Sequence, residues 1–549
     1  MSISDNNRLL TIKDLVIEGY QGEQWHEIVK GVSLHLDRGK VLGLIGESGA
    51  GKSTIGIASM GYAIAGCRIR SGSIVFDGQE LFGADEETLR RLRGPRISYV
   101  AQSAAASFNP AHKLTHQFAE TAIQEGIMSF AQAEKRAKEL FRRLDLPDPD
   151  NIGSRFPHQV SGGQVQRCMV AMSMACNPDL IIFDEPTTAL DVTTQIEVLG
   201  AIKEVIADYN SAAIYITHDL AVVAQIADRI MVLLHGLEVE TNSTRQIIDN
   251  PKEDYTRALL AVRKKRGEIV NHDQQGTVLE VENVTAAYSN GVVVLDGVST
   301  KISRGKTVAV VGESGSGKST LARVITGLLP PVGGAVRFHG SLVPPRTKAR
   351  DKELLRRIQM IYQMADTAMN PKHRVRKIIG RPLSFYFGIT GKKLEERILE
   401  LLDQIELGEK YIDRFPSELS GGEKQRICIA KALAAEPELI ICDEITSALD
   451  QLVAEGILEL LQNLQNELAV SYLFITHDLD TVKAISDEIV VMYQGKVVEQ
   501  GTSQQILNPP FEPYTDLLLS SAPEMDPDWL ERVIEHRKEL ATMGVNLST

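Results

Sequence analysis

Four motifs occur twice in this chain, and this duplication constrains its architecture more than any other feature. The segment GESGAGKST at residues 46–54 returns as GESGSGKST at residues 312–320. SGGQ from Ser161, FDEPTTALD ending at Asp191 and ITHDL with His218 return in related form at Ser420, Asp450 and His477, all with one constant offset. Solenoids and propellers repeat every ~20–50 residues, so a much longer period predicts two complete domains in tandem.

The boundary between the two copies is predicted in a short polar segment. LTIKDLVIEGY from Leu10 matches LEVENVTAAY from Leu279, and RKKRGEIVNHDQQG lies just before the second match. This segment has neither helical nor strand periodicity, and its basic residues favour a solvated linker over a phosphate-binding patch. We therefore expect a first domain at residues 1–262, a linker at 263–277 and a second domain at 278–549 that includes a tail from about residue 520.

Composition excludes several classes of protein. The 549 residues include 59 Lys+Arg and 72 Asp+Glu, a net charge of −13, which argues against a general nucleic-acid binder. No apolar run approaches the ~20 residues of a membrane-spanning helix, and the segment from Met1 to Asp14 does not resemble a secretory signal. The five cysteines form no C-x-x-C pair, so we expect a cytosolic protein without a disulfide framework or zinc ribbon.

Each copy has the strand pattern of an α/β domain. VLGLI from Val41 and TVAVV from Thr307 lead directly into the glycine-rich loops. LIIF and IYIT follow in the first copy, and LIIC and LFIT follow in the second. Continuous Val/Ile/Leu runs of this length indicate strands covered on both faces. Helical segments alternate with them, which predicts a mainly parallel sheet in each half.

The glycine-rich loops carry the P-loop pattern G-x-x-x-x-G-K-[ST]. Backbone N–H groups of such a loop cradle phosphates at a helix N-terminus. Lys52 and Lys318 are expected to reach the β- and γ-phosphates, and Ser53 and Ser319 to bind Mg²⁺. Two matches, each directly after an apolar strand, make a coincidental glycine loop a negligible alternative.

An acidic pair ends a buried strand in each copy. Asp184 and Asp443 stand where a carboxylate holds the Mg²⁺ shell. The next residues, Glu185 and Glu444, are placed to orient the attacking water. Such a pair can simply cap the next element, but its place beside a P-loop favours catalysis.

A serine and two glycines open a predicted helix in each copy, as SGGQ from Ser161 and SGGE from Ser420. A helix N-terminus of this kind presents N–H groups to an anion. Taken alone, the S-G-G triplet is usually only a loop. Its place upstream of the Asp-Glu strand in both halves makes it a strong indication of nucleotide binding.

In this order, P-loop, SGG[QE], D-E, A-L-D and T-H-D resemble an ABC-type ATPase domain, present twice and covering nearly the whole chain. The resemblance implies an α/β fold of tandem P-loop ABC ATPase domains. Each would have a RecA-like, mainly parallel core, an antiparallel β subdomain and a helical subdomain. It also implies that the two halves pair head to tail within one chain. Each nucleotide would then lie between the P-loop of one half and the SGG segment of the other.

The resemblance assigns ATP and Mg²⁺ to two sets of residues. Those of site one are Gly46, Glu47, Ser48, Gly49, Ala50, Gly51, Lys52, Ser53, Thr54, Gln102 and Tyr20, closed by Ser420, Gly421, Gly422 and Glu423. Those of site two are Gly312, Glu313, Ser314, Gly315, Ser316, Gly317, Lys318, Ser319, Thr320, Gln363 and Tyr288, closed by Ser161, Gly162, Gly163 and Gln164. The expected metal ligands are Ser53, Gln102 and Asp184, and Ser319, Gln363 and Asp443. The expected catalytic residues are Glu185 and Glu444 with the switch histidines His218 and His477.

An aromatic ring near the first strand is expected to stack on the adenine. Tyr288 precedes the P-loop lysine Lys318 at a spacing along the chain that fits this role. In the first half Tyr20, which precedes Lys52 at nearly the same spacing, is preferred over the nearby Trp25. Either ring could instead belong to the core.

Further segments resemble the ATPases of the oligopeptide/dipeptide/nickel importers. They are FNPAHK and MNPKHR after the glutamines, and NPKEDYTRALL from Asn250 and NPPFEPYTDLLL from Asn508 near the domain ends. In that family the two ATPase domains are usually separate proteins, so this chain resembles their fusion. Some relatives carry a cysteine-ligated iron–sulfur cluster in such tails, but neither tail here has a cysteine, and we expect no cluster. Ile445 replaces the usual proline after the catalytic glutamate, and activity is still expected because Asp443 and Glu444 remain.

The resemblance implies an ATP-hydrolysing motor subunit of an importer of peptides or related small solutes. Two integral membrane permease subunits and a substrate-binding protein would be its partners, at the cytoplasmic face of the bacterial inner membrane. The alternative is a soluble twin-ABC translation factor acting on ribosomes. Such factors have a long basic linker and read N-H-L-D, whereas this chain has a short linker and reads T-A-L-D and S-A-L-D. The cargo stays open among peptides, nickel, opines and oligosaccharides.

Overall fold

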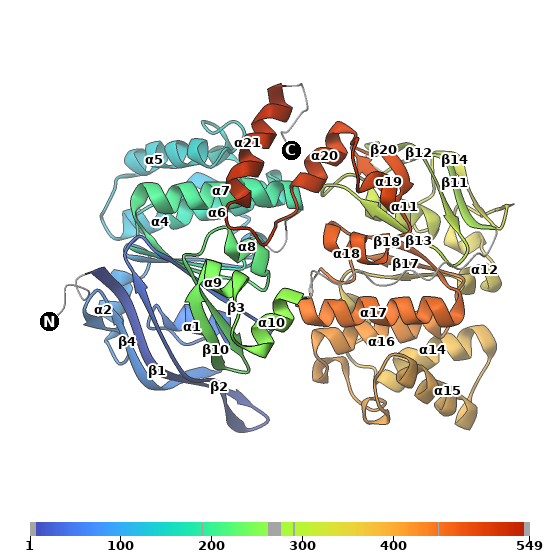
Figure 1. Cartoon of the computed structure of the whole chain (residues 1–549), viewed down its shortest axis with the longest axis horizontal. Helices are drawn as coiled ribbons and strands as arrows, with labels where there is room; N and C mark the ends of the chain where they lie inside the picture. Colours follow the sequence, from blue (N-terminus) through green and yellow to red (C-terminus); the bar gives the residue numbers. More distant parts are fainter. Residues whose placement is uncertain (1–6, 188–189, 262–275, 289–290, 448, 543–549) are drawn as a thin grey trace. The chain divides into compact units, whose positions relative to one another are not determined.

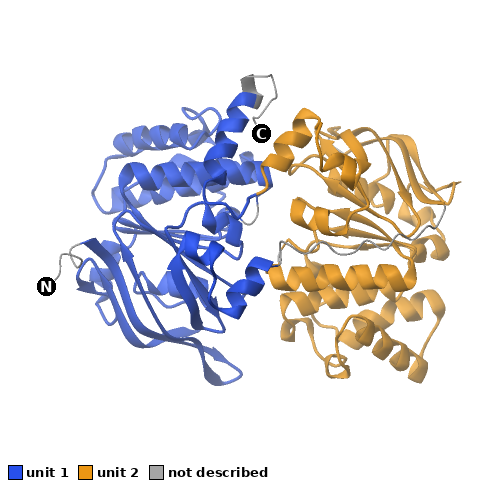
Figure 2. Cartoon of the chain, in the orientation of Figure 1, with its two compact units in different colours: residues 1–261, 523–549 blue, residues 262–522 orange. Residues whose placement is uncertain are grey.

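The computed structural model describes residues 7–187, 190–261, 276–288, 291–447 and 449–542. The chain divides into two compact units (Figure 2). Unit 1 contains residues 1–261 and 523–549, and unit 2 contains residues 262–522. Residues 263–275 of the predicted linker lie outside the described part of the chain.

Each unit is built on a six-stranded sheet, with the orders β10-β9-β3-β8-β7-β6 and β16-β17-β18-β13-β19-β20. Strand pairs are parallel except at the antiparallel edges β9–β10 and β19–β20. All residues of the central strands β7 and β8 are buried, as expected for strands covered on both faces. The predicted mainly parallel α/β core is confirmed. The strands of these sheets are β3 (Val41–Gly46), β6 (Ile97–Val100), β7 (Leu180–Asp184), β8 (Ala212–Ile216), β9 (Arg229–Leu234), β10 (Leu237–Ser243), β13 (Thr307–Val311), β16 (Ile358–Ile361), β17 (Leu439–Asp443), β18 (Ser471–Ile475), β19 (Glu488–Tyr493) and β20 (Lys496–Thr502).

A smaller antiparallel sheet accompanies each core, with the orders β2-β1-β4-β5 and β12-β11-β14-β15. Alternate side chains of β1, such as Leu10 and Ile12, are buried in one hydrophobic cluster with Leu42 and Leu44 of β3. Apolar alternation thus fixes which face of this sheet meets the core. The strands of these two small sheets are β1 (Arg8–Gln21), β2 (Gln24–Asp37), β4 (Cys67–Phe76), β5 (Gln79–Glu80), β11 (Thr277–Ala287), β12 (Val293–Ser303), β14 (Gly333–Phe338) and β15 (Ser341–Leu342).

In each unit, the helices between the edge strand and the strand that ends in the Asp-Glu pair form the helical subdomain. These strands are β6 and β7 in unit 1, and β16 and β17 in unit 2. Within the helical subdomain of unit 1, α5 begins with a capping box of Ser129 and Gln132 and buries Ala133, Ala137 and Leu140 on one face. The helices of unit 1 are α1 (Lys52–Ala58), α2 (Glu86–Leu92), α3 (Ala104–Ser107), α4 (Leu114–Gln124), α5 (Phe130–Arg143), α6 (Gly162–Ser173), α7 (Val192–Tyr209), α8 (Leu220–Ala224), α9 (Thr244–Asp249), α10 (Asp254–Ala261) and α21 (Trp529–Thr542). Those of unit 2 are α11 (Lys318–Ile325), α12 (Lys352–Arg357), α13 (Ala365–Ala368), α14 (Val375–Phe387), α15 (Gly391–Gln404), α16 (Gly421–Leu433), α17 (Gln451–Leu468), α18 (Leu479–Ile485), α19 (Ser503–Ile506) and α20 (Pro513–Ser520).

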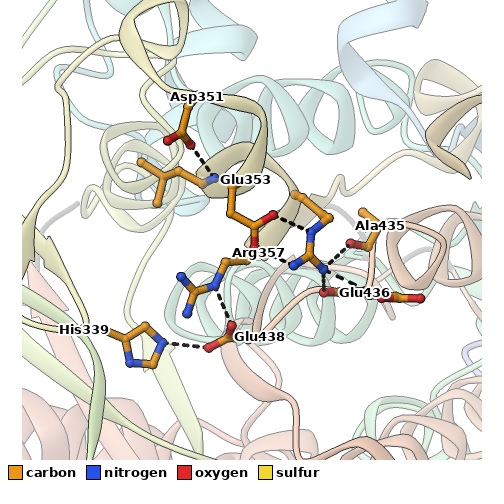
Figure 3. Close-up of polar contacts among 9 residues, drawn as sticks. His339, Asp351, Glu353, Arg357, Ala435, Glu436 and Glu438 are labelled. Carbon is orange, nitrogen blue, oxygen red and sulfur yellow. Dashed lines mark hydrogen bonds and ion pairs between the residues drawn. The ribbon is translucent and has the colours of Figure 1, made fainter. Parts of the chain in front are cut away.

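A polar network ties the small sheet of unit 2 to the edge of its core sheet (Figure 3). Glu438, just before β17, accepts a hydrogen bond from Arg357 at the end of α12 and lies 2.7 Å from Nε2 of His339 after β14. Burial opposes ionisation of Glu438, but the hydrogen bonds from Arg357 and His339 outweigh it and lower its pKa. We call this network the joint. In unit 1, Arg96 forms the matching joint by donating hydrogen bonds to Asp77 and Asp179.

The C-terminal segment differs from its prediction. The sequence-based boundaries assigned the tail to the second domain, whereas residues 523–549 belong to unit 1 (Figure 2). The helix α21 packs across α7 (Figure 1). Its side chains Trp529 and Leu530 are buried, so apolar packing holds the segment on the first unit.

Candidate functional site

The loop between β3 and α1 has a backbone that only glycine accommodates. Gly46, Gly49 and Gly51 have φ of 148°, 84° and 92°. A Cβ added at Gly46 would lie 2.0 Å from the carbonyl oxygen of Leu233, whereas one at Gly49 would meet nothing within 4 Å. The loop is therefore packed against β9 on one side and bare at its tip. The loop at residues 312–317 repeats this geometry.

The loop lysine is held by the loop itself in both units. Nζ of Lys52 donates hydrogen bonds to the carbonyls of Gly46 at 2.7 Å and Glu47 at 2.9 Å. Nζ of Lys318 donates to the matching carbonyls of Gly312 and Glu313, both at 2.7 Å. Both lysines are buried, so each cation is fixed beside the N–H groups of the loop.

The next serine meets the strand-end aspartate in each unit. Oγ of Ser53 donates to Asp184 at 2.8 Å, and Oγ of Ser319 donates to Asp443 at 2.9 Å. Burial raises the pKa of both aspartates, and the adjacent glutamate adds to this rise. A hydroxyl and a carboxylate brought together in this way are oxygen donors of the kind that Mg²⁺ prefers. The residues present therefore fit a magnesium ion.

The glutamate after each aspartate is held in an uncommon conformation. Glu185 and Glu444 have φ of 48° and 49°, a left-handed backbone that costs energy for residues other than glycine. Nε2 of Gln102 donates to Glu185 at 2.8 Å, and Nε2 of Gln363 donates to Glu444 at 2.6 Å. Gln102 and Gln363, which the sequence predicts as metal ligands, thus also hold the two carboxylates in place.

A histidine lies on the other oxygen of each glutamate. Nδ1 of His218 is 3.2 Å from Glu185, and Nδ1 of His477 is 3.4 Å from Glu444. Burial opposes charge on both histidines, but the hydrogen bond and the attraction of the glutamate outweigh it and raise the pKa of each. Burial likewise opposes charge on Glu444, whereas His477 outweighs it and lowers the pKa of Glu444.

The SGG segments begin the helices α6 and α16. Ser161 and Ser420 are N-caps, and the side chains of Gln164 and Glu423 fold back to complete capping boxes. A Cβ added at Gly162 would meet nothing within 4 Å, so this stretch of backbone is bare. The two side chains predicted to contact nucleotide, Gln164 and Glu423, thus hold the helix start.

The predicted adenine-stacking residues differ in their surroundings. The hydroxyl of Tyr288 lies 3.3 Å from Oγ1 of Thr320 and accepts from Arg323 on α11, so its ring lies next to the P-loop helix. Tyr20 pairs instead with Trp25 across the β1–β2 hairpin, with ring centroids 5.2 Å apart. Stacking by Tyr20 stays a prediction.

Two tyrosines contact the sites without having been predicted. Tyr99 donates to the second oxygen of Asp184 at 2.6 Å, whereas the residue that matches Tyr99 in unit 2 is Met360, which has no hydroxyl. The hydroxyl of Tyr514, within the NPPFEPY segment, accepts from the backbone N–H of Glu313 in the P-loop at 3.0 Å. Tyr99 lies near the strand end in the sequence ISYV, which reads only as a buried strand.

Within each unit the structure brings together the predicted lysine, serine, aspartate, glutamate, glutamine and histidine. Closure of each site by the SGG segment of the other domain stays a prediction. Residues 188–189 and 448, which belong to the T-A-L-D and S-A-L-D motifs, lie outside the described part of the chain.

Comparison with known proteins matches both units. The ABC transporter family profile matches residues 29–188 and 295–447, and the profile of the oligopeptide/dipeptide transporter C-terminal region matches residues 498–544. The glutathione import ATP-binding protein GsiA of Salmonella choleraesuis (strain SC-B67) is 35% identical over 565 residues, covering 95% of this chain and 91% of that protein. GsiA of Escherichia coli (strain K12) gives the same identity and coverage.

The ABC transporter profile covers the P-loop, the SGG segment and the Asp-Glu pair of both halves, and the second profile covers the C-terminal region that the sequence had linked to oligopeptide importers. They agree with the geometry, in which a P-loop, a serine–aspartate pair and a glutamate with two fixed partners occur in each unit. The chain belongs to the ABC transporter family, as an ATPase with two ATP-binding domains fused in one polypeptide.

Proposed function

We propose that this chain is the motor subunit of an ABC importer and that it drives uptake of a peptide or related small solute. The observation that carries the proposal is the doubled site, in which each unit brings together the lysine, serine, aspartate, glutamine and glutamate expected at an ATPase site. The relatives named for glutathione import and the oligopeptide/dipeptide C-terminal region support the direction and the solute class. The same region disfavours the ribosome-acting alternative.

Phosphates bind at the P-loop in this proposal. Bare backbone N–H groups at the loop tip and the fixed Nζ of Lys52 or Lys318 act together on the same anionic groups. Magnesium, when bound, neutralises charge that develops on the phosphates. Ser53 with Asp184, and Ser319 with Asp443, would hold it, together with Gln102 and Gln363.

Glu185 and Glu444 serve as general bases. Each carboxylate takes a proton from the attacking water, and each is oriented on one oxygen by a glutamine amide and on the other by a histidine. The raised pKa of His218 keeps the imidazole positively charged over a wider pH range, which stabilises the negative charge of Glu185. Tyr288 and Tyr20 are proposed to stack on adenine.

From the family resemblance we further propose that Ser420, Gly421 and Gly422 complete the site of Lys52. Ser161, Gly162 and Gly163 would likewise complete the site of Lys318. ATP binding would draw the two domains together, and hydrolysis would let them separate. This cycle would be passed to two permease subunits that receive solute from a binding protein.

We place the chain at the cytoplasmic face of the inner membrane as a peripheral subunit. Within the described ranges, every helix falls short of the length and apolarity needed to cross a bilayer. The segments after Gln102 and Gln363 are proposed to contact the permease subunits. These segments include the exposed residues Ala106 and Thr367.

The experiment is crosslinking in intact cells from single cysteines at Ala106 and Thr367. The control is a cysteine at Gln79, an exposed residue of the small sheet. We expect both test positions to capture integral membrane proteins, identified by mass spectrometry, and the control to capture none. Crosslinks that reach only ribosomal proteins, or only this chain, would contradict the importer function.

A further inference from the structure

After α20 the chain passes from unit 2 to unit 1. Residues 523–537 contact α8 and α7, and α21 packs across α7 (Figures 1 and 2). Trp529, Leu530 and Val533 are 3%, 0% and 6% exposed. This degree of burial shows a docked segment with its own apolar contacts. We call residues 523–537 the tail segment.

The first anchor of the tail segment is Gln225, at the C-terminal end of α8. Its Nε2 donates to the carbonyls of Glu524 at 2.8 Å and Asp526 at 3.0 Å. Its Oε1 accepts from the backbone N–H of Leu530 at 3.1 Å. One buried amide thus satisfies three backbone groups of the tail segment. The helix that it ends starts at Leu220, shortly after His218.

The second anchor is Arg537 on α21. Its guanidinium donates to the carbonyl of Thr193 at 2.9 Å and to Glu197 at 3.0 Å, both on α7. The other oxygen of Glu197 pairs with Arg167 on α6 at 3.3 Å. The side chains of Arg167 and Arg537 are 5% and 9% exposed. Removing one partner from so buried a set of charges has a large effect.

These anchors reach the helices that begin at three motifs of the site. The helix α6 begins at Ser161, and α7 begins at Asp191, whose carboxylate caps it through the N–H of Thr194. A Cβ added at Gly163 would lie 2.4 Å from Thr194, so the starts of α6 and α7 are in direct contact. With α8 following His218, the tail segment contacts α7 and α8 directly and α6 through Glu197.

The residues of unit 1 that bind the tail segment have no equivalents in unit 2. At the matching positions of the second copy, Gln225 corresponds to Ala484 and Glu197 to Gly456. Two exposed ion pairs, Lys203–Glu531 and Arg245–Asp528, also hold the tail segment on unit 1. In the second copy, the positions of the two basic residues are taken by Gln462 and Gln504. Ala484 has no amide and Gly456 has no carboxylate, so unit 2 cannot make these contacts.

We propose that the tail segment is an intramolecular brace that positions α6, α7 and α8 of unit 1 for ATP hydrolysis, with Gln225 and Arg537 as positioning residues. The proposal rests on the proposed function of the two sites. The brace acts on the switch histidine and on the SGG helix, whereas the contacts of Lys52 and Ser53 with the P-loop and Asp184 involve none of its residues. Undocking should therefore lower kcat and leave the KM for ATP nearly unchanged.

Trp529 supplies a direct reporter of docking. The chain has two tryptophans, Trp25 and Trp529, so Trp25→Phe leaves the buried ring of the tail segment as the sole tryptophan, which can be excited at wavelengths that tyrosine does not absorb. In this background we compare Arg537→Met and Gln225→Ala, the latter installing the residue found in unit 2. Lys538→Met is the matched control, since it removes an exposed charge next to Arg537. Arg537→Lys keeps the positive charge but has a single donor nitrogen in place of the two that Arg537 uses.

We expect Arg537→Met and Gln225→Ala to shift the emission of Trp529 to the red and to lower kcat by roughly 10–100-fold, as small misplacements of catalytic groups do. The KM for ATP should stay within about twofold. Arg537→Lys should restore part of kcat, and Lys538→Met should change neither signal. A red-shifted emission with unchanged kcat would overturn the brace, as would equal losses from Lys538→Met. If Arg537→Met does not fold, Gln225→Ala alone decides.

Failure of the proposed function would give a different experimental result from failure of the brace. If the background protein hydrolyses ATP at a rate that Glu185→Gln with Glu444→Gln leaves unchanged, the sites themselves are misassigned. If that double variant is inactive while undocking of Trp529 has no effect on kcat, only the brace is wrong.

Discussion

Glu185 and Glu444 share a left-handed backbone, a glutamine partner and a histidine partner, although they lie in different units. A strained residue persists only where the surrounding structure fixes it, and such residues gather at sites of function. The shared conformation, together with the two fixed partners, is a structural observation independent of the sequence motif, and it supports the proposed role of both glutamates. It marks the carboxylate as a group whose direction matters.

Replacing both carboxylates by amides tests their role as bases. Glu185→Gln with Glu444→Gln keeps the shape but cannot take a proton, so hydrolysis should fall by about 10²–10⁴-fold. Binding of ATP with Mg²⁺ should persist, because Lys52, Ser53 and Asp184 are untouched. The measurements are the ATPase rate and the nucleotide stoichiometry of the purified protein, with the exposed Glu204→Gln as control. Near-normal hydrolysis in the double variant would show that another group activates water.

The histidine–glutamate pairs predict a pH dependence of stability. The pKa of His218 and of His477 is raised above 6.5 in the folded protein, because the attached glutamates outweigh burial. Their contribution to the free energy of unfolding is therefore complete below the unfolded pKa of about 6.5 and is lost as the pH rises through the folded pKa. Denaturant titrations of wild type and of His218→Gln with His477→Gln should differ most in acid and converge in base. A constant difference across the range would contradict the assignment.

At the scale of elements, the joint around Glu438 connects three segments of unit 2 (Figure 3). Glu438→Gln removes the charge that Arg357 and His339 share. We expect a loss of roughly 1 kcal/mol in unfolding free energy, since the pair is partly exposed. Because the pKa of Glu438 is lowered, this contribution is present above its unfolded pKa and disappears as the pH falls through the folded pKa. Glu467→Gln, at an exposed position on α17 of the same unit, is the control, and an equal loss there would contradict the joint.

Elements with a local pattern could be predicted from the sequence, and long-range packing could not. Continuous apolar runs predict the buried strands, and glycines at fixed spacing predict the P-loops. The tail segment has no such signal, because Gln225 and Glu524 are far apart in the chain and each is an ordinary polar residue in its own surroundings. Gln164 and Glu423 show a second limit, since S-G-G-[QE] predicts both an anion site and a capping box. Only the structure shows that the side chains cap the helix.

At the scale of the whole molecule, the duplication makes the two halves similar but not equal. Asp184 has Tyr99 as a partner, whereas the position of unit 2 that matches Tyr99 is Met360, and the tail segment docks on unit 1. Two sites with different supports need not turn over at the same rate. A test that assigns turnover to each half is therefore informative about the whole motor.

The proposed exchange of SGG segments between halves predicts which pairs of lesions are additive. If Ser420 completes the site of Lys52, then Ser420→Arg should add little to Lys52→Ala, because both damage one site. Combined with Lys318→Ala, the same change should remove the remaining hydrolysis. Loss of the Ser420 helix cap costs about 1 kcal/mol of stability in both combinations, so it cancels from the comparison. ATPase rates of the two double variants, with Ser161→Arg as the reciprocal case, decide the pairing. Losses that add with Lys52→Ala but not with Lys318→Ala would mean that each half uses its own SGG segment.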